Sequence, residues 1–230
     1  MNEPTPEPGP LLGPHEQAAF AQSVENVRRA GAMYLAGHRA EDAVIAFVAN
    51  VQHGVDGLVA KARADGKRID CEAGCSHCCK ARVETSAPEV FAIVTEIDGR
   101  PTAERTELIA ALERRVALPS QADATWATRS ACPFLIDHLC SIYAVRPTAC
   151  RKAHSTDVTR CASYAPFIPQ DLALALGAQA LIRGTTMAYA DFGVDATGVE
   201  LVGAVVAALH DPSMRRRWVE GESVFATGSI

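Results

Sequence analysis

Apolar residues recur every three or four positions over several long stretches of this chain, which is the spacing of one face of an α-helix. The pattern predicts two helices at the start, 14–37 and 41–64, joined by a turn at Gly37 and His38. The apolar stripe of the second helix consists of Val44, Val48, Val51, Val55, Leu58 and Ala62. We therefore expect an antiparallel helical pair before the middle of the chain.

Further helices are predicted in the second half from start signals and apolar spacing. Ser86 and Glu89 form a capping-box pattern with Pro88 inside the first turn, and Thr197 and Glu200 repeat the box. The expected helices span 86–97, 102–116, 121–129, 169–187, 197–209 and 211–218. Period-two alternation is never sustained, so the fold class is mainly α: a bundle-like helical scaffold around a loop-rich centre, with little or no β.

All the cysteines lie in that loop-rich centre, which has many prolines and little periodicity. The eight residues are Cys71, Cys75, Cys78, Cys79, Cys132, Cys140, Cys150 and Cys161. We expect one helical domain over 14–220 with a cysteine core at 69–165. A disordered tail at 1–13 and a frayed tail at 221–230 are expected to flank it.

Length and charge narrow the class of protein. With 230 residues the chain is long enough to bury a core without cysteine cross-links, and its net charge of −5 argues against nucleic acid as a partner. The N-terminal stretch has no apolar signal-peptide core, and no uncharged apolar run of about 18 residues predicts a membrane helix. We expect a cytoplasmic protein without a membrane partner, in which thiols remain reduced.

Reduced thiols at this density indicate a metal, and zinc is one interpretation. Tetrahedral zinc sites use paired thiolates two to four residues apart, as in Cys75-x-x-Cys78, with Cys71 as a third ligand. The downstream cysteines would complete the site, and His77 or His154 could supply a nitrogen. Disulfides are the third and least favoured interpretation, because the expected compartment is reducing.

An iron–sulfur cluster is the favoured interpretation. Cys71-x3-Cys75-x2-Cys78 can wrap three thiolates around one corner of a cluster, and a distant cysteine would supply the fourth. Radical S-adenosylmethionine enzymes share this spacing, but their β/α barrel is excluded by the helical pattern here. Eight thiols exceed one mononuclear site, and in extended backbone Cys78 and Cys79 would point in opposite directions. Two sites, or one cluster with spare thiols, both remain open.

The order of motifs resembles a known family. The double cysteine at Cys78-Cys79 is followed by Glu89, then by Cys132-Pro-Phe-Leu, Cys140-Ser-Ile-Tyr143 and Arg146-Pro147-x-x-Cys150-Arg151. This order is similar to that of the cysteine-cluster family described as zinc- or iron-chelating domains, over about Cys71 to Cys161. One relative, flagellin lysine methylase, carries a similar cluster and uses S-adenosylmethionine. The resemblance implies a metal site and makes iron–sulfur binding credible.

Three functional hypotheses follow. The first is a metal-binding protein whose eight cysteines ligate an iron–sulfur cluster or zinc. The second is an enzyme that uses an open metal position for redox chemistry or methyl transfer. Its candidate polar groups beside the metal are Tyr143, Arg146 and Arg151. The third is a structural zinc module that binds an unidentified protein. Glu89 is interpreted as a helix cap rather than a ligand.

Overall fold

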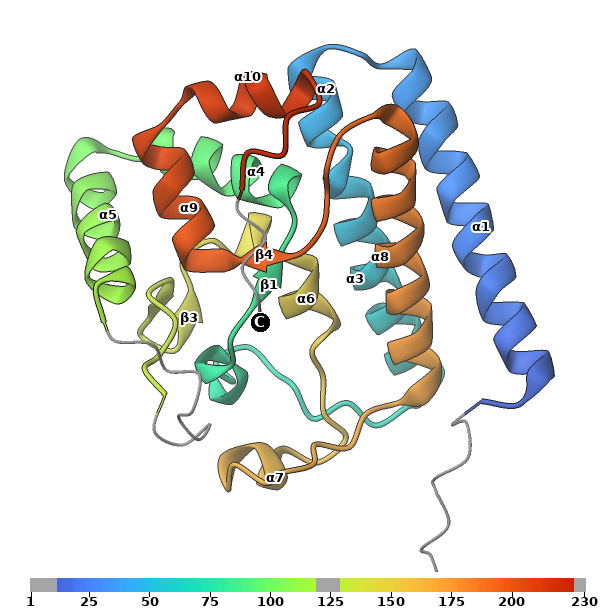
Figure 1. Ribbon diagram of the computed structural model, residues 1–230. Helices are drawn as coiled ribbons and strands as arrows, with labels where there is room; N and C mark the ends of the chain where they lie inside the picture. Colours follow the sequence, from blue (N-terminus) through green and yellow to red (C-terminus); the bar gives the residue numbers. More distant parts are fainter. Residues whose placement is uncertain (1–11, 119–128, 226–230) are drawn as a thin grey trace, which may run out of the picture.

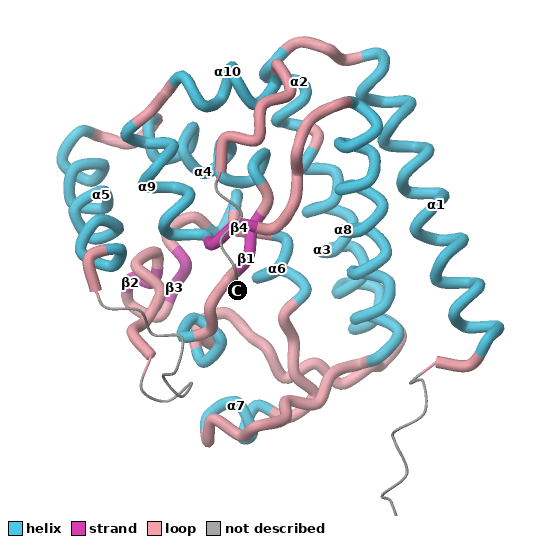
Figure 2. Tube along the Cα trace, in the orientation of Figure 1, coloured by secondary structure: helices cyan, strands magenta, loops and turns pink. Residues whose placement is uncertain are grey.

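The computed structural model describes residues 12–118 and 129–225. Of these residues, 63% lie in helices and only 4% in strands, which confirms the mainly α class. The expected helix at 121–129 and most of the two expected tails lie outside the described residues. Figure 1 shows the helices arranged around a central region of loops, and Figure 2 shows how little strand these loops contain.

The helices and strands are as follows. The α-helices are α1 (Pro14–Gly37), α2 (Glu41–Ala46), α3 (Val48–Ala64), α4 (Ala87–Asp98), α5 (Thr102–Val116), α6 (Thr148–Lys152), α7 (Val158–Ala162), α8 (Leu172–Phe192), α9 (Leu201–His210) and α10 (Ser213–Val219). Two 3₁₀ turns, η1 (His77–Lys80) and η3 (Tyr143–Val145), lie in the central loops. The strands are β1 (Glu84–Thr85), β2 (Leu135–Ile136), β3 (Leu139–Cys140) and β4 (Val199–Glu200).

The first packing unit is formed by α1, α3 and α8, which lie side by side in Figure 1. Small residues let α1 and α8 approach closely. A β-carbon added at Gly184 would come within 2.5 Å of Val27 Cβ, and one added at Gly31 within 2.7 Å of Ala188 Cβ. Glycine at both positions therefore sets the distance between these two helices.

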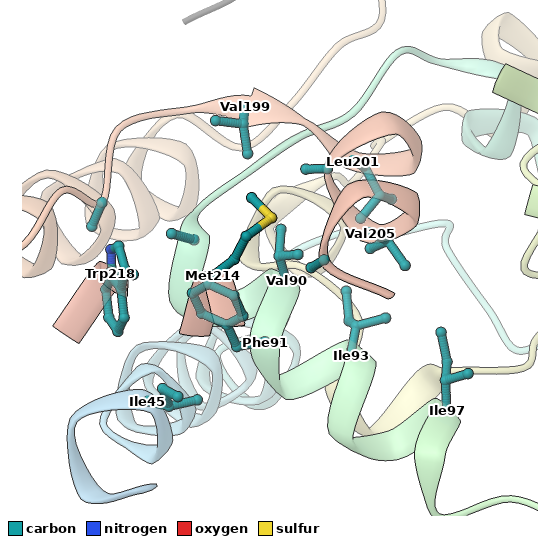
Figure 3. Packing of buried hydrophobic residues seen from close by; sticks show 14 of the residues in the cluster. Ile45, Val90, Phe91, Ile93, Ile97, Val199, Leu201, Val205, Met214 and Trp218 are labelled. Atoms are coloured by element: carbon teal, nitrogen blue, oxygen red, sulfur yellow. The ribbon is translucent and has the colours of Figure 1, made fainter. Parts of the chain in front are cut away.

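The second packing unit joins α4, α9 and α10 into a continuous core with α2 (Figure 3). Figure 3 shows Val90, Phe91, Ile93 and Ile97 of α4 facing α9 and α10. Trp218 of α10 is fully buried among these side chains, and its Nε1 donates to the carbonyl oxygen of Asp195 at 2.5 Å. The indole is thereby both packed and hydrogen-bonded, as a buried tryptophan requires.

Two short antiparallel strand pairs connect distant segments. In one, β1 pairs with β4 and sets Glu84 opposite Glu200, which brings the segment after the first cysteines to the start of α9. In the other, β2 and β3 form a hairpin whose turn residues Asp137 and His138 have φ of 47° and 64°. Positive φ at both central residues is typical of the turn that suits the right-handed twist of a hairpin.

The helix starts agree with the sequence pattern in part. The capping box of α4 is confirmed: Ser86 is the N-cap, and the Glu89 side chain accepts from its backbone N–H. The box expected at Thr197 is wrong, because Glu200 itself caps α9 by accepting from Gly203 N–H at 2.7 Å. Helix α5 spans the expected residues 102–116, with Pro101 as its N-cap residue.

The expected helix 41–64 is divided at Phe47 into α2 and α3. Its length and mean hydropathy would suit a membrane span, a property shared by the core helices of many folded proteins. Within the structure, Val44, Val48, Val51 and Val55 are buried. The apolar stripe thus faces the interior of the protein, where α3 packs against α8 and α6.

Candidate metal centre

The cysteines are carried by the loops and short helices between α3 and α8, and all eight are free thiols. Cys78 and Cys79 lie on η1, Cys140 on β3, Cys150 on α6 and Cys161 on α7. Cys71 and Cys75 precede η1, and Cys132 precedes β2. The expectation of loops with a few helical turns is correct for this region (Figure 2).

Backbone and side-chain hydrogen bonds bring the early and late cysteine segments together. The Cys132 N–H donates to the carbonyl oxygen of Cys79 at 2.7 Å. Asp70, next to Cys71, donates through its N–H to the Ser155 carbonyl oxygen at 2.9 Å and accepts from Val158 N–H at 3.1 Å. These contacts join segments that are more than fifty residues apart in the chain, as a shared ligand site requires.

The thiols fall into two sets according to which of them interact electrostatically. In the first, the Cys71 thiol interacts with three others, so the set is Cys71, Cys75, Cys78 and Cys161. In the second, the Cys79 thiol interacts with three others, so the set is Cys79, Cys132, Cys140 and Cys150. Cys78 also interacts with Cys150, so the two sets adjoin. Each set combines early and late cysteines.

The two sets meet at the double cysteine. Its backbone is a 3₁₀ turn and not the extended backbone considered from the sequence. The two thiols share a hydrogen bond, which lowers the pKa of Cys79 and raises that of Cys78. Cys79 is therefore the thiol of this pair that more readily becomes a thiolate, the form that binds metals.

Burial opposes ionisation elsewhere in the second set. Desolvation raises the pKa of Cys132 to about 11 and that of Cys150 to about 12, and it also raises the pKa of Cys140. In the first set, desolvation and the three neighbouring thiols raise the pKa of Cys71. A bound cation removes this penalty, because it compensates the charge of several thiolates at once.

Arginine side chains border the second set. The positive charge of Arg146 favours the thiolate forms of Cys78, Cys140 and Cys150, and so lowers each pKa against the larger effect of burial or hydrogen bonding. Its guanidinium lies 4.2 Å from the centre of the Tyr143 ring. Its Nε is buried and has no hydrogen-bond partner among the described residues. Arg146 is thus placed to offset negative charge on this thiol set.

Arg151 has a different role, which is to hold the loop that carries these residues. It is buried, and its guanidinium donates to the carbonyl oxygens of Tyr143, Ala144 and Arg146. It also forms an ion pair of 2.5 Å with Asp56 of α3. Asp56 was not identified by any spacing pattern, since its importance arises only when α6 packs against α3.

The histidines considered as nitrogen ligands differ in their surroundings. His154 is buried, and its Nε2 accepts from the Asp171 N–H at 2.9 Å while its Nδ1 donates to the Lys152 carbonyl oxygen at 2.8 Å. Both ring nitrogens are therefore engaged, Nε2 with the N-cap residue of α8 and Nδ1 with the last residue of α6. His77 lies on η1 beside Cys78, and His138 contacts Ser76 Oγ at 3.2 Å.

The donor set fits a thiophilic metal. Two groups of four sulfur atoms match the all-cysteine ligand sets of structural zinc and of iron–sulfur clusters. Over residues 12–118 and 129–225, no three His, Cys, Asp or Glu side chains form a ready-made ligand set. The thiols are gathered, but their final convergence within either set is not built into this arrangement.

Fold and thiols together define a mainly α-helical protein with a thiol-rich centre between its helices. Residues 70–167 of this chain match the CxxCxxCC family model, described as a putative zinc- or iron-chelating domain. That segment contains all eight cysteines, and the match confirms the resemblance noted from the motifs. No curated protein and no solved structure matches the chain.

Proposed function

We propose that this protein binds iron or zinc through the thiolates of its eight cysteines, with an iron–sulfur cluster favoured over zinc. The observation that carries the proposal is that hydrogen bonds join the early and late cysteine segments: Asp70, beside Cys71, bonds with Ser155 and Val158, and the Cys132 N–H donates to the Cys79 carbonyl oxygen. Charged thiolates repel one another, so such a grouping is favourable only when protons or a cation compensate the charge. The family description points to the same metals.

The division into two sets supports two four-cysteine sites. In the first set, Cys71, Cys75 and Cys78 have the spacing of a cluster-wrapping loop, and Cys161 is the distant fourth ligand. The second set, which contains Cys79, Cys132, Cys140 and Cys150, has the positive charge of Arg146 beside it. We assign the iron–sulfur cluster to the first set, and a second cluster or a structural zinc ion to the second set.

The test is anaerobic purification from iron-replete cells, followed by iron, zinc and sulfide analysis and an absorption spectrum. A cluster gives iron and sulfide together with absorption near about 400 nm, whereas zinc is colourless. Full zinc with no iron would overturn the cluster assignment but keep the thiolate site. Protein without either metal would overturn the proposal altogether.

Variants of one cysteine from each set test the division. Cys161→Ser should reduce the cluster absorption and spare the metal of the second set, and Cys150→Ser should do the reverse. Ser155→Ala is not a suitable control, because the Ser155 hydroxyl donates to the Asp157 carbonyl oxygen within the site loops. Ser23→Ala on α1 is better matched, since Ser23 is exposed and far from the cysteines in sequence. Equal loss of all metal in both cysteine variants would show one shared site.

A structural module for protein binding is a second candidate, and the β2–β3 hairpin favours it. Ile136 and Leu139 flank the turn and are 54% and 58% exposed, next to Cys140. A metal bound at Cys140 would order the hairpin, so that its exposed apolar tip is presented in a fixed conformation to a partner protein. We place either form of the protein in the cytoplasm, where free thiols persist.

A further inference from the structure

A cavity of about 300 Å³ lies between α3, α6, α8 and β1. Its polar lining includes Glu84, Lys152 and Gln179, and its apolar lining includes Val48, Val51 and Ile182. Ligand pockets are typically concave, mostly apolar and provided with a few fixed polar groups. A volume at the lower end of their usual range favours a small metabolite over a nucleotide.

Lys152 supplies a positive charge to this cavity. Its Nζ donates to Gln179 Oε1 on α8 at 2.9 Å, which holds the ammonium at the boundary between α6 and α8. An ammonium has three N–H donors, so two remain for other partners. Among the described residues, no carboxylate lies within ion-pair distance of this group.

Glu84 supplies a negative charge to the same cavity. Its carboxylate lies beside Gly198, where an added β-carbon would come within 3.1 Å of Oε2. In the part of the chain that the structure describes, this carboxylate has neither a salt bridge nor a hydrogen bond. Glu84 and Lys152 therefore line one cavity with opposite charges and do not pair with each other.

Two other polar groups of the cavity, the Glu89 carboxylate and the Tyr189 hydroxyl, already have hydrogen-bond partners. Glu89 accepts hydrogen bonds from Thr85, Ser86 and Thr148, and the Tyr189 hydroxyl donates to the Val44 carbonyl oxygen at 2.9 Å. A ligand would have to break these bonds to use either group, at a cost in free energy. Lys152 and Glu84 are the charged groups of the cavity that remain open to a ligand.

We propose that this cavity binds a small zwitterion with an aliphatic side chain, the chemistry of a free α-amino acid. The ligand's carboxylate would accept from Lys152 Nζ, and its ammonium would donate to the Glu84 carboxylate. The aliphatic part would then lie on Val48, Val51 and Ile182. Such a ligand bridges two opposite charges that the protein keeps apart, and each contact is a charge-assisted hydrogen bond.

Isothermal titration of the full, reduced chain with three probes of the same carbon skeleton tests the proposal. L-Leucine carries both charges, 4-methylpentanoate only the carboxylate and 3-methylbutylamine only the ammonium. We expect saturable binding of leucine, and at least about tenfold weaker binding of each analogue. No saturable binding of leucine, or equal binding of either analogue, would overturn the proposal.

Variants assign the two contacts. Lys152→Gln and Glu84→Gln should each weaken leucine binding about tenfold or more, and Thr186→Phe should abolish it by filling the cavity. Lys61→Gln is the matched control, because Lys61 lies on an exposed face of α3. Circular dichroism confirms that each variant is folded before titration. Leucine binding that is unchanged in both charge variants would refute the assignment.

Discussion

Glu89 and Thr148 are joined by two short hydrogen bonds across 59 residues of chain. The Glu89 carboxylate accepts from the Thr148 backbone N–H at 2.5 Å and from its hydroxyl at 2.6 Å, while its other oxygen caps α4. One buried carboxylate therefore holds the first turns of both α4 and α6. The short helix α6 is held in part by this contact and in part by the ion pair of Arg151 with Asp56 of α3.

Glu89→Gln should lower the free energy of unfolding by about 2 kcal/mol, because an amide presents N–H groups to donors that need an acceptor. Urea denaturation monitored by circular dichroism measures the change. Glu107→Gln is the control, since Glu107 lies on an exposed face of α5, and it should change stability by less than about 0.5 kcal/mol. Equal effects in the two variants would contradict the role given to Glu89.

Gly184→Ala should destabilise the protein by about 1–3 kcal/mol, since the new methyl group would overlap Val27 and the Val24 carbonyl oxygen. Gly57→Ala is the comparison variant on α3, because a β-carbon added there has no neighbouring atom within 4 Å. There the better helix propensity of alanine should stabilise by about 0.5–1 kcal/mol. Thermal unfolding of both variants distinguishes packing from propensity by the sign of the change.

Arg151→Lys should lower the free energy of unfolding by about 2 kcal/mol. The planar guanidinium donates to three carbonyl oxygens and to Asp56 at once, and a lysine ammonium cannot reproduce this set of hydrogen bonds. Arg114→Lys on the exposed face of α5 is the matched control. Chemical denaturation gives the stability, and metal analysis gives the retained metal. We expect metal retention to fall in Arg151→Lys alone, since the loop that bears Tyr143 and Arg146 would loosen.

Metal removal should loosen residues 71–161 and leave α1 and α3 protected against hydrogen exchange. The cysteine segments have short helices and half-buried thiols, whereas α3 has a buried stripe of Val48, Val51 and Val55. Exchange measured by mass spectrometry on metal-loaded and metal-free protein tests this. Equal protection of the cysteine segments in both states would count against a folding role for the metal.

Much of the helical scaffold follows from local patterns in the sequence. Pro14 and Gly37 bound α1 as predicted, and Asp171 caps α8 by accepting from Leu174 N–H at 2.9 Å. Such signals act within one turn, so a single sequence contains them. The predictions fail where tertiary contacts determine the structure. Val199 and Glu200 form a strand because β1 lies beside them, and the expected helix 41–64 is interrupted at the buried Phe47.

The candidate site was predictable in composition but not in arrangement. Cysteine spacing indicated the candidate ligands and the resemblance to the family. It also predicted that Cys71, Cys75 and Cys78 belong to one site. It could not show that Cys78 and Cys79 share a 3₁₀ turn, or that Cys161 joins the earliest cysteines. Nor could it identify Asp56 as the partner of Arg151, because contacts across 95 residues leave no local pattern.

The pairing of α1 and α3 with α8 also has a consequence for how the chain folds. These helices meet only after the chain between Ala64 and Leu172, a loop of roughly one hundred residues, has been closed, and the entropy of that closure opposes folding. Hydrogen bonds of Asp70 with Ser155 and Val158, near the two ends of that loop, bring its ends together independently of the helices. Part of the closure entropy is thus offset by contacts within the cysteine segments themselves, before the helices pack against one another.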